Sequence, residues 1–221
     1  SSLQASSSLE AVLLWGPRQV GKTTLLEQLG LASEAFLDDL FLRQRAQNDP
    51  ALFMNGLNLP CLIDEAQYAP NLFPEIKLRI DRQRRERLKG LVAQTKTHFY
   101  LTGSNRLFLD KNVKESLAGR CNIYALHGLS VKEISAHFPD LPLKTILYKG
   151  GFPELYARNE LAVSEYLNAY ISTFIEKDIA ATAGIEKLGA FQTVLGLLAA
   201  RTGQFIQISE IATAAGVDQK T

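Results

Sequence analysis

The segment from Gly16 to Thr23 combines two glycines, a lysine and a threonine in a spacing that suits phosphate chemistry. It matches the pattern G-x-x-x-x-G-K-[ST] through Gly16, Pro17, Arg18, Gln19, Val20, Gly21, Lys22 and Thr23, and Thr24 follows directly. Glycines let the backbone curl so that its N–H groups face a polyphosphate, and a following helix adds positive potential. We expect the residues from Gly16 to Thr24 to bind the nucleotide. Within them Lys22 would reach the β- and γ-phosphates, and Thr23 would offer its hydroxyl to Mg²⁺. The alternative, a glycine loop with an exposed lysine, is the weaker interpretation because the motif lies between a predicted strand and a predicted helix.

Two adjacent carboxylates follow another apolar run, Leu59 to Ile63. An acidic residue at a strand end beside the loop can hold Mg²⁺, usually through a water, and we assign this role to Asp64. Glu65 is then placed to accept a proton from a water aimed at the γ-phosphorus, which favours hydrolysis of ATP over transfer of its phosphate. A small-molecule kinase would not need Glu65. A helix cap near Tyr68 is the structural alternative.

A polar turn and an arginine complete the candidate catalytic set. Ser104 follows the apolar run Phe99–Leu101 and can bond the γ-phosphate or the attacking water, with Thr102 and Asn105 as second choices, whereas a plain turn is the alternative. Arg120 comes just after a predicted helix, where it can neutralise charge on the transferred phosphoryl group, in its own chain or on a neighbour's ATP. A structural arginine at a helix C-terminus is equally compatible with this position.

Alternating strands and helices must position these residues. Short apolar runs that each end in polar residues predict strands, namely Ala11–Trp15, Ala35–Leu37, Leu59–Ile63, Phe99–Leu101 and Ile123–Leu126. Stretches of helical periodicity lie between them, namely a helix after Gly21 that stops at Gly30, then Leu40–Met54, Leu72–Lys89 and Leu107–Leu117. This order predicts an α/β fold, in which a parallel sheet delivers its polar side chains to one edge.

Helical patterns dominate after about Gly128. Leu161–Ile179 and Ile185–Ala200 have apolar residues at helical spacing and predict a lid or companion domain. From Ile206 to Thr221 the sequence predicts the start of a helix-turn-helix, with Ser209 as N-cap and Gly216 at the turn. We therefore divide the chain into a leading segment 1–10, a core 11–128, a helical lid 129–204 and the start of a winged helix 205–221.

Composition excludes several classes of protein. The 221 residues are 46% hydrophobic and 21% charged with a net charge of +1, which is typical of a folded globular chain and demands no polyanionic partner. Cys61 and Cys121 lie in separate apolar runs and read as reduced thiols, which favours the cytoplasm. No apolar stretch approaches the roughly 20 residues that span a bilayer. The histidines and cysteines lack zinc-ligand spacing.

The same motifs resemble those of a known family, the AAA-superfamily (AAA+) P-loop ATPases of bacteria and archaea with a C-terminal domain of unknown function (DUF4143-type). The matching segments are Gly16–Leu26, Asp64–Gln67, Leu101–Ser104, Ser116–Arg120 and Gly150–Glu154. The resemblance implies an ATP-binding core of the additional-strand, catalytic-glutamate type, then a helical lid and a winged helix. The chain is also similar to signal-transduction ATPases in which a Gly-x-Pro element of the lid touches the nucleotide. This similarity implies that Gly151 and Pro153 lie near the adenine, and a plain Gly-rich turn with proline is the alternative. Because members extend further on both sides, we expect this chain to be truncated at both ends.

These features predict a slow ATPase that binds ATP or ADP and acts as a nucleotide-dependent switch. Guanine specificity is disfavoured because Asn-Lys-x-Asp is not in the sequence. The alternative is a DNA-binding regulator with a structural nucleotide, which draws on the winged helix and on the basic stretch Lys77–Lys89, although a solvated helix face explains that stretch as well. A nucleic-acid motor is a third, weaker hypothesis. Candidate partners are DNA, another copy of the chain or a different protein, and we expect no membrane.

Overall fold

The computed structural model describes residues 9–90, 98–104, 113, 115–174 and 188–218. They divide into two compact units, Ser1–Asn159 and Glu160–Thr221. The predicted core lies in the first unit, which extends beyond the predicted boundary at residue 128.

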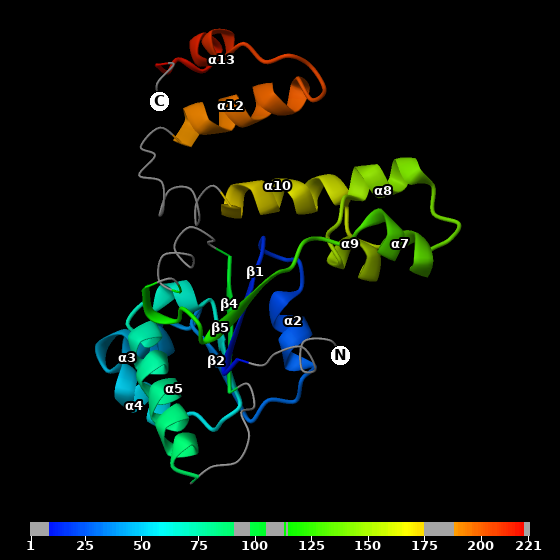
Figure 1. The fold of residues 1–221 in the computed structure, drawn as a ribbon. Helices are drawn as coiled ribbons and strands as arrows, with labels where there is room; N and C mark the ends of the chain where they lie inside the picture. Colours follow the sequence, from blue (N-terminus) through cyan, green and yellow to red (C-terminus); the bar gives the residue numbers. More distant parts are fainter. Residues whose placement is uncertain (1–8, 91–97, 105–112, 114, 175–187, 219–221) are drawn as a thin grey trace. The chain divides into compact units, whose positions relative to one another are not determined.

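A five-stranded parallel sheet forms the centre of the first unit (Figure 1). Its strands are β1 (Ala11–Trp15), β2 (Ser33–Phe36), β3 (Cys61–Asp64), β4 (Phe99–Gly103) and β5 (Cys121–Ala125). The spatial order is β2-β3-β4-β1-β5, and every neighbouring pair is parallel. Because β4 lies between β3 and β1, the polar residues that end these three strands meet at one edge of the sheet. This confirms the predicted fold class.

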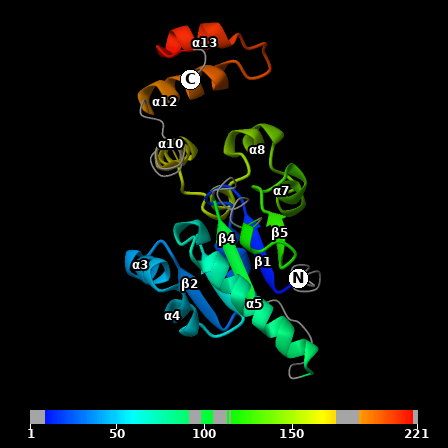
Figure 2. The ribbon, with the colours of Figure 1, turned by 60° about the vertical axis from the view of Figure 1, so that its left-hand side comes forward.

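Helices cover both faces of the sheet (Figure 1), and one of these two layers faces the viewer in Figure 2. On one face Leu13 of β1 belongs to a core built with α3 (Leu40–Asn48), α4 (Pro50–Asn55) and α5 (Leu72–Leu88). On the other face Val12 and Leu14 pack with Leu26 of α2 (Lys22–Glu27). Successive side chains of a strand point to opposite faces, so the fully apolar run of β1 serves both layers at once.

The predicted helix from Leu40 to Met54 is two helices, which corrects the sequence interpretation. Pro50 occupies the first turn of α4, and the Asp49 side chain accepts a hydrogen bond from the backbone N–H of Leu52 at 2.8 Å. Proline at N1 and aspartate at N-cap are strong start signals for a new helix. The predicted helix Leu72–Lys89 is confirmed as α5, whereas most of the predicted helix Leu107–Leu117 lies outside the described residues.

Three short helices follow β5 within the first unit: α7 (Val131–His137), α8 (Leu143–Lys149) and α9 (Glu154–Ala157). A capping box between Ser130 and Glu133 begins α7, and a small apolar cluster of Ile134, Ile146 and Tyr156 joins the three helices. This segment is therefore a compact extension of the core unit.

The second unit contains α10 (Val163–Phe174), α12 (Leu188–Ala200) and α13 (Ile208–Ala215). The N-cap of α13 is Gln207, whose carbonyl accepts from the N–H of Ile211 at 3.3 Å, so the predicted N-cap Ser209 lies inside the first turn. Gly216 ends α13 with a φ of 65°, in agreement with the predicted turn. No helix among the described residues is long and apolar enough to cross a bilayer.

Candidate nucleotide-binding site

The loop between β1 and α2 has the backbone geometry that a phosphate-binding loop needs. Gln19 and Gly21 have φ angles of 61° and 91°, and α2 begins directly at Lys22. Gly16 packs so tightly that a Cβ atom there would lie 2.0 Å from the carbonyl oxygen of Leu126. The loop is therefore fixed against the backbone that follows β5, and glycine is required at its first position.

Lys22 lies within this loop and is 6% exposed. Its ammonium group donates hydrogen bonds to the carbonyl oxygens of Gly16 at 3.0 Å and Pro17 at 2.8 Å. The lysine thus spans the start and the end of the loop. Thr24, the last predicted ligand of this segment, is exposed on α2.

Asp64 joins the loop to two strands. Both Thr23 of α2 and Thr102 of β4 donate a hydroxyl hydrogen to Oδ1 of Asp64, at 2.8 and 2.5 Å. No described residue donates to its second oxygen, Oδ2. Asp64 is 8% exposed, so its carboxyl group lies nearly buried between two hydroxyl donors. The structure brings together the two residues predicted to hold a metal, Thr23 and Asp64, and hard oxygen atoms of this kind suit Mg²⁺.

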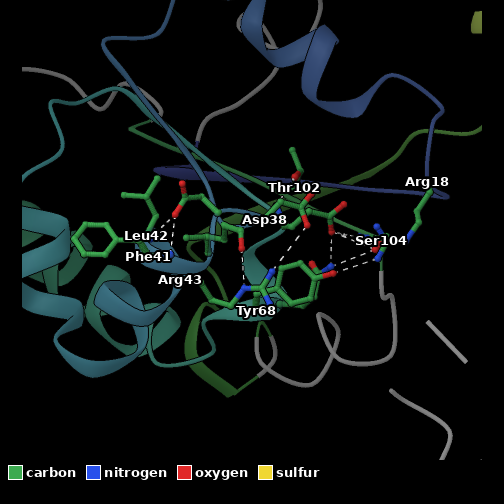
Figure 3. A network of polar contacts seen from close by, with 12 residues as sticks. Arg18, Asp38, Phe41, Leu42, Arg43, Tyr68, Thr102 and Ser104 are labelled. Atoms are coloured by element: carbon green, nitrogen blue, oxygen red, sulfur yellow. Dashed lines mark hydrogen bonds and ion pairs between the residues drawn. The ribbon is translucent and has the colours of Figure 1, made fainter. Parts of the chain in front are cut away.

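Glu65 follows in a left-handed backbone conformation, with φ 53° and ψ 48°. For a residue with a side chain this costs roughly 1–2 kcal/mol. Its N–H donates to the hydroxyl of Thr102 at 3.0 Å, and its Oε2 accepts from the N–H and the hydroxyl of Ser104, at 3.3 and 3.2 Å (Figure 3). The strained turn aims the carboxylate at the end of β4. The helix-cap alternative for this carboxylate is wrong, because Glu65 makes no capping hydrogen bond to the short helix η1 (Ala66–Tyr68).

Two residues of η1 were not assigned a role from the sequence. Gln67 donates from Nε2 to Oε2 of Glu65 and to the hydroxyl of Ser104 at 3.2 Å. Tyr68 accepts a hydrogen bond from Arg18 of the loop at 3.3 Å, and the Arg43 guanidinium lies 3.9 Å from its ring centroid (Figure 3). In the sequence, only the closeness of Gln67 and Tyr68 to Asp64 and Glu65 indicated these contacts.

Arg120 is not in the candidate site. It precedes β5, at the amino-terminal edge of the sheet, and forms a two-pronged ion pair with Asp81 of α5 at 2.6 and 3.1 Å. This corrects the prediction that it acts on ATP in its own chain, because parallel strands carry their amino ends at the edge opposite the loop. Action on a neighbour's ATP stays a prediction. Asn105 lies outside the described residues.

Four of the seven basic residues in the stretch Lys77–Lys89 form ion pairs within the chain. Arg79 and Arg82 form ion pairs with Glu75 and Glu86 one turn away. Arg84 and Arg87 both bind Glu10 at the amino-terminal edge of the sheet. These pairs favour a structural, solvated helix face over a nucleic-acid surface.

Gly151 lies beside the segment that leaves β5. Its carbonyl oxygen accepts a hydrogen bond from the N–H of Leu129 at 2.7 Å, and a Cβ at Gly151 would lie 2.7 Å from the carbonyl oxygen of Leu129. Pro153 is the N-cap of α9. Because β5 pairs with β1, this turn belongs to the same end of the sheet as the phosphate loop.

The two cysteines are not in environments that make a thiol reactive. Both are free thiols, and burial raises the pKa of Cys61 and of Cys121 to about 12. Neither forms a thiolate near neutral pH, so both are structural. Among the described residues no three His, Cys, Asp or Glu side chains cluster as metal ligands would.

Comparison with known proteins agrees with this geometry. The model of a family described as "AAA domain" matches residues 8–135, more than half of the chain. The chain belongs to this AAA domain family. Its core is that of an AAA+ P-loop ATPase, a fold that supports nucleotide binding. A second model, a domain of unknown function (DUF8612), matches residues 141–221.

Two curated relatives of this AAA domain protein are themselves uncharacterized. They are Rv2008c of Mycobacterium tuberculosis and Mb2031c of Mycobacterium bovis, each 32% identical over 213 residues. The alignment covers 95% of this chain, which spans 45% of the length of each relative.

Solved structures overlap with the chain only partly. A RuvB variant of Thermotoga maritima aligns with a TM-score of 0.42 at 16% identity, covering 100% of this chain and 78% of that one. The ADP form of Aeropyrum pernix ORC2 aligns with a TM-score of 0.31 at 13% identity, covering 96% and 64%. Membership of the family rests on the family model, not on these overlaps.

Proposed function

We propose that this chain binds MgATP and hydrolyses it slowly in the cytoplasm, and that hydrolysis switches the state of its C-terminal region. The observation that carries the proposal is the meeting of Lys22, Thr23, Asp64, Glu65 and Ser104 at one edge of the sheet. A loop lysine, a metal-type carboxylate and a second carboxylate beside it are the parts that nucleotide hydrolysis requires.

Binding uses the loop. Backbone N–H groups from Gly16 to Thr23 would face the β- and γ-phosphates, and Lys22 would exchange its two carbonyl partners for phosphate oxygens. Thr23 and Asp64 would hold Mg²⁺, which supplies neutralisation of the phosphate charge. Gly151 and Pro153 would contact the adenine, in keeping with the family resemblance.

Hydrolysis uses the carboxylate of Glu65. A water oxygen forms the new bond to the γ-phosphorus, the bond from phosphorus to the bridging oxygen breaks, and ADP leaves with that electron pair. Glu65 accepts the proton that the water loses. Ser104 would hold the γ-phosphate or the same water. In this reaction water receives the phosphoryl group, so the proposed activity is hydrolysis and not transfer to a second substrate as in a kinase.

The switch would act on the segments that follow the core. We propose that the helical lid over 129–204 and the start of a winged helix over 205–221 change position when ATP is hydrolysed. We also propose that Arg120 acts on the ATP of a neighbouring copy. A DNA-binding regulator with a structural nucleotide is the alternative, and the internal ion pairs of α5 weigh against it.

Two variants test the proposal. Lys22→Ala should abolish nucleotide binding, measured with a fluorescent ATP analogue. Glu65→Gln keeps the shape of the side chain and should bind MgATP normally while losing turnover, measured as phosphate release. An active Glu65→Gln protein would contradict the assignment of Glu65 as the base. The rate per molecule should be measured over a range of protein concentrations, because a rate that rises with concentration indicates that subunits complete each other's sites.

A further inference from the structure

Gln67 makes a set of contacts that its place in the turn does not require. Its amide nitrogen donates to Glu65 Oε2 and to the hydroxyl of Ser104, so both N–H bonds of the amide are used. With the amide nitrogen facing Glu65, both of these hydrogen bonds have a donor and an acceptor, because carboxylate and hydroxyl oxygens can accept. The amide oxygen, Oε1, is buried and has no partner among the described residues.

The turn is held by other bonds. The N–H of Tyr68 donates to the carbonyl of Glu65 at 3.0 Å, the N–H of Ala69 donates to Ala66 at 3.1 Å, and Gln47 of α3 donates its side-chain N–H to the carbonyl of Tyr68. A buried acceptor without a partner costs free energy. Gln67 has a buried oxygen that no described residue pairs with, and other hydrogen bonds already hold the turn. The position of its side chain is therefore explained by something other than the stability of the turn.

The three donors on Glu65 all contact the same oxygen. Oε2 accepts from Gln67 and from both the N–H and the hydroxyl of Ser104, whereas no described residue donates to Oε1. A carboxylate restrained in this way has one occupied oxygen and one oxygen that can take a proton. The long, rotatable side chain of glutamate needs such restraint to act as a base in a fixed direction.

We propose that Gln67 is a positioning residue for ATP hydrolysis: its amide fixes the carboxylate of Glu65 so that Oε1 is the oxygen that accepts the proton of the attacking water. The proposal rests on the role of Glu65 as the base. Ser104 shares the restraint from the end of β4, so η1 and β4 hold the carboxylate from two sides.

Two variants of Gln67 test this in the intact chain. Gln67→Met keeps the length of the side chain and removes its donors, and Gln67→Glu keeps its shape but places a second negative charge beside Glu65. Both should lower kcat by about tenfold or more while the dissociation constant for ATP stays within about threefold. Gln47→Glu is the matched control, because it removes an amide bond to the same turn without touching Glu65, and its kcat should stay within about twofold.

The outcomes separate the inference from the function on which it depends. Normal kcat in both Gln67 variants, together with an inactive Glu65→Gln, overturns the positioning role and leaves the base in place. Parallel losses of kcat, ATP affinity and melting temperature, matched by Gln47→Glu, also overturn it, because they indicate that the turn has collapsed. An active Glu65→Gln overturns the proposed function instead.

Discussion

The carboxylates at the two edges of the sheet have different hydrogen-bond partners. At the amino-terminal edge Glu10 is 2% exposed and binds Arg84 through two bonds of 2.8 and 2.6 Å, with Arg87 at 3.1 Å. At the other edge Asp64 and Glu65 are each 8% exposed, and their hydrogen-bond donors among the described residues are neutral hydroxyl and amide groups.

This difference indicates what each edge is for. Burying a charge is costly unless an opposite charge accompanies it. At the amino-terminal edge the chain supplies that charge itself, so the arrangement is complete and contributes to stability. At the other edge neutral donors orient the carboxylates, which suits the Mg²⁺ site that we propose there. Changes at the two edges should therefore separate stability from activity.

The largest effect is expected from Asp64→Asn. The asparagine oxygen can still accept from Thr23 and Thr102, so the free energy of unfolding should change little, while the loss of the metal-holding charge should lower MgATP turnover by about a hundredfold. Phosphate release over a Mg²⁺ titration, together with thermal melting, measures both. A variant that unfolds but turns over ATP normally when folded would abolish the contrast between the edges.

Glu10→Gln should give the opposite pattern, with about 2 kcal/mol lost from the free energy of unfolding and ATP turnover per folded molecule unchanged. Urea unfolding followed by circular dichroism measures the first, and phosphate release the second.

The effect of Glu10→Gln should depend on pH. Burial alone would raise the pKa of Glu10. The hydrogen bonds from Arg84 and Arg87, a backbone hydrogen bond and the charge of Arg84 outweigh burial and lower that pKa from its ordinary value of 4.5. A lowered pKa stabilises the folded state above pH 4.5, and this contribution is lost as the pH falls through the folded-state value. The difference between wild type and Glu10→Gln should shrink on acidification, and a constant difference would argue against the ion pair.

The smallest effect is expected from Asp81→Asn, which removes the partner of Arg120. The hydrogen bond from Arg120 lowers the pKa of Asp81. Because the pair is partly exposed, with side chains 22% and 29% accessible, its loss should cost below about 1 kcal/mol.

Arg120→Ala serves as the functional counterpart. If Arg120 acts on a neighbour's ATP, mixing Arg120→Ala with Lys22→Ala should restore turnover that neither variant has alone. No recovery in the mixture would restrict Arg120 to its structural pair with Asp81.

The sequence predicted the strands well, because each apolar run ends in polar residues and parallel strands carry such ends to one edge. For the same reason it predicted the phosphate loop and the positions of Asp64 and Ser104 at the ends of β3 and β4, whereas their roles stay predictions. It could not predict the surroundings of Arg120, because distance from a helix end says nothing about which edge of the sheet a residue reaches. The break between α3 and α4 could have been predicted, because Asp49 and Pro50 are typical residues at the start of a helix. The continuous helical periodicity favoured one long helix instead. The contacts of Gln67 depend on a turn with a positive φ at Glu65, and the residue types in this turn do not indicate that conformation.

The close approach of backbone to backbone around the loop has a mechanical consequence. A Cβ at Gly16 would lie 2.0 Å from the carbonyl oxygen of Leu126, and a Cβ at Gly128 would lie 2.7 Å from the carbonyl oxygen of Gly151. Side chains in a contact absorb a small displacement by changing rotamer, but main chain against main chain has no such compliance. The first residue of the loop and the turn before α9 are thus linked through a rigid coupling. A shift of a few tenths of an ångström at either end would be transmitted to the other instead of being damped between them.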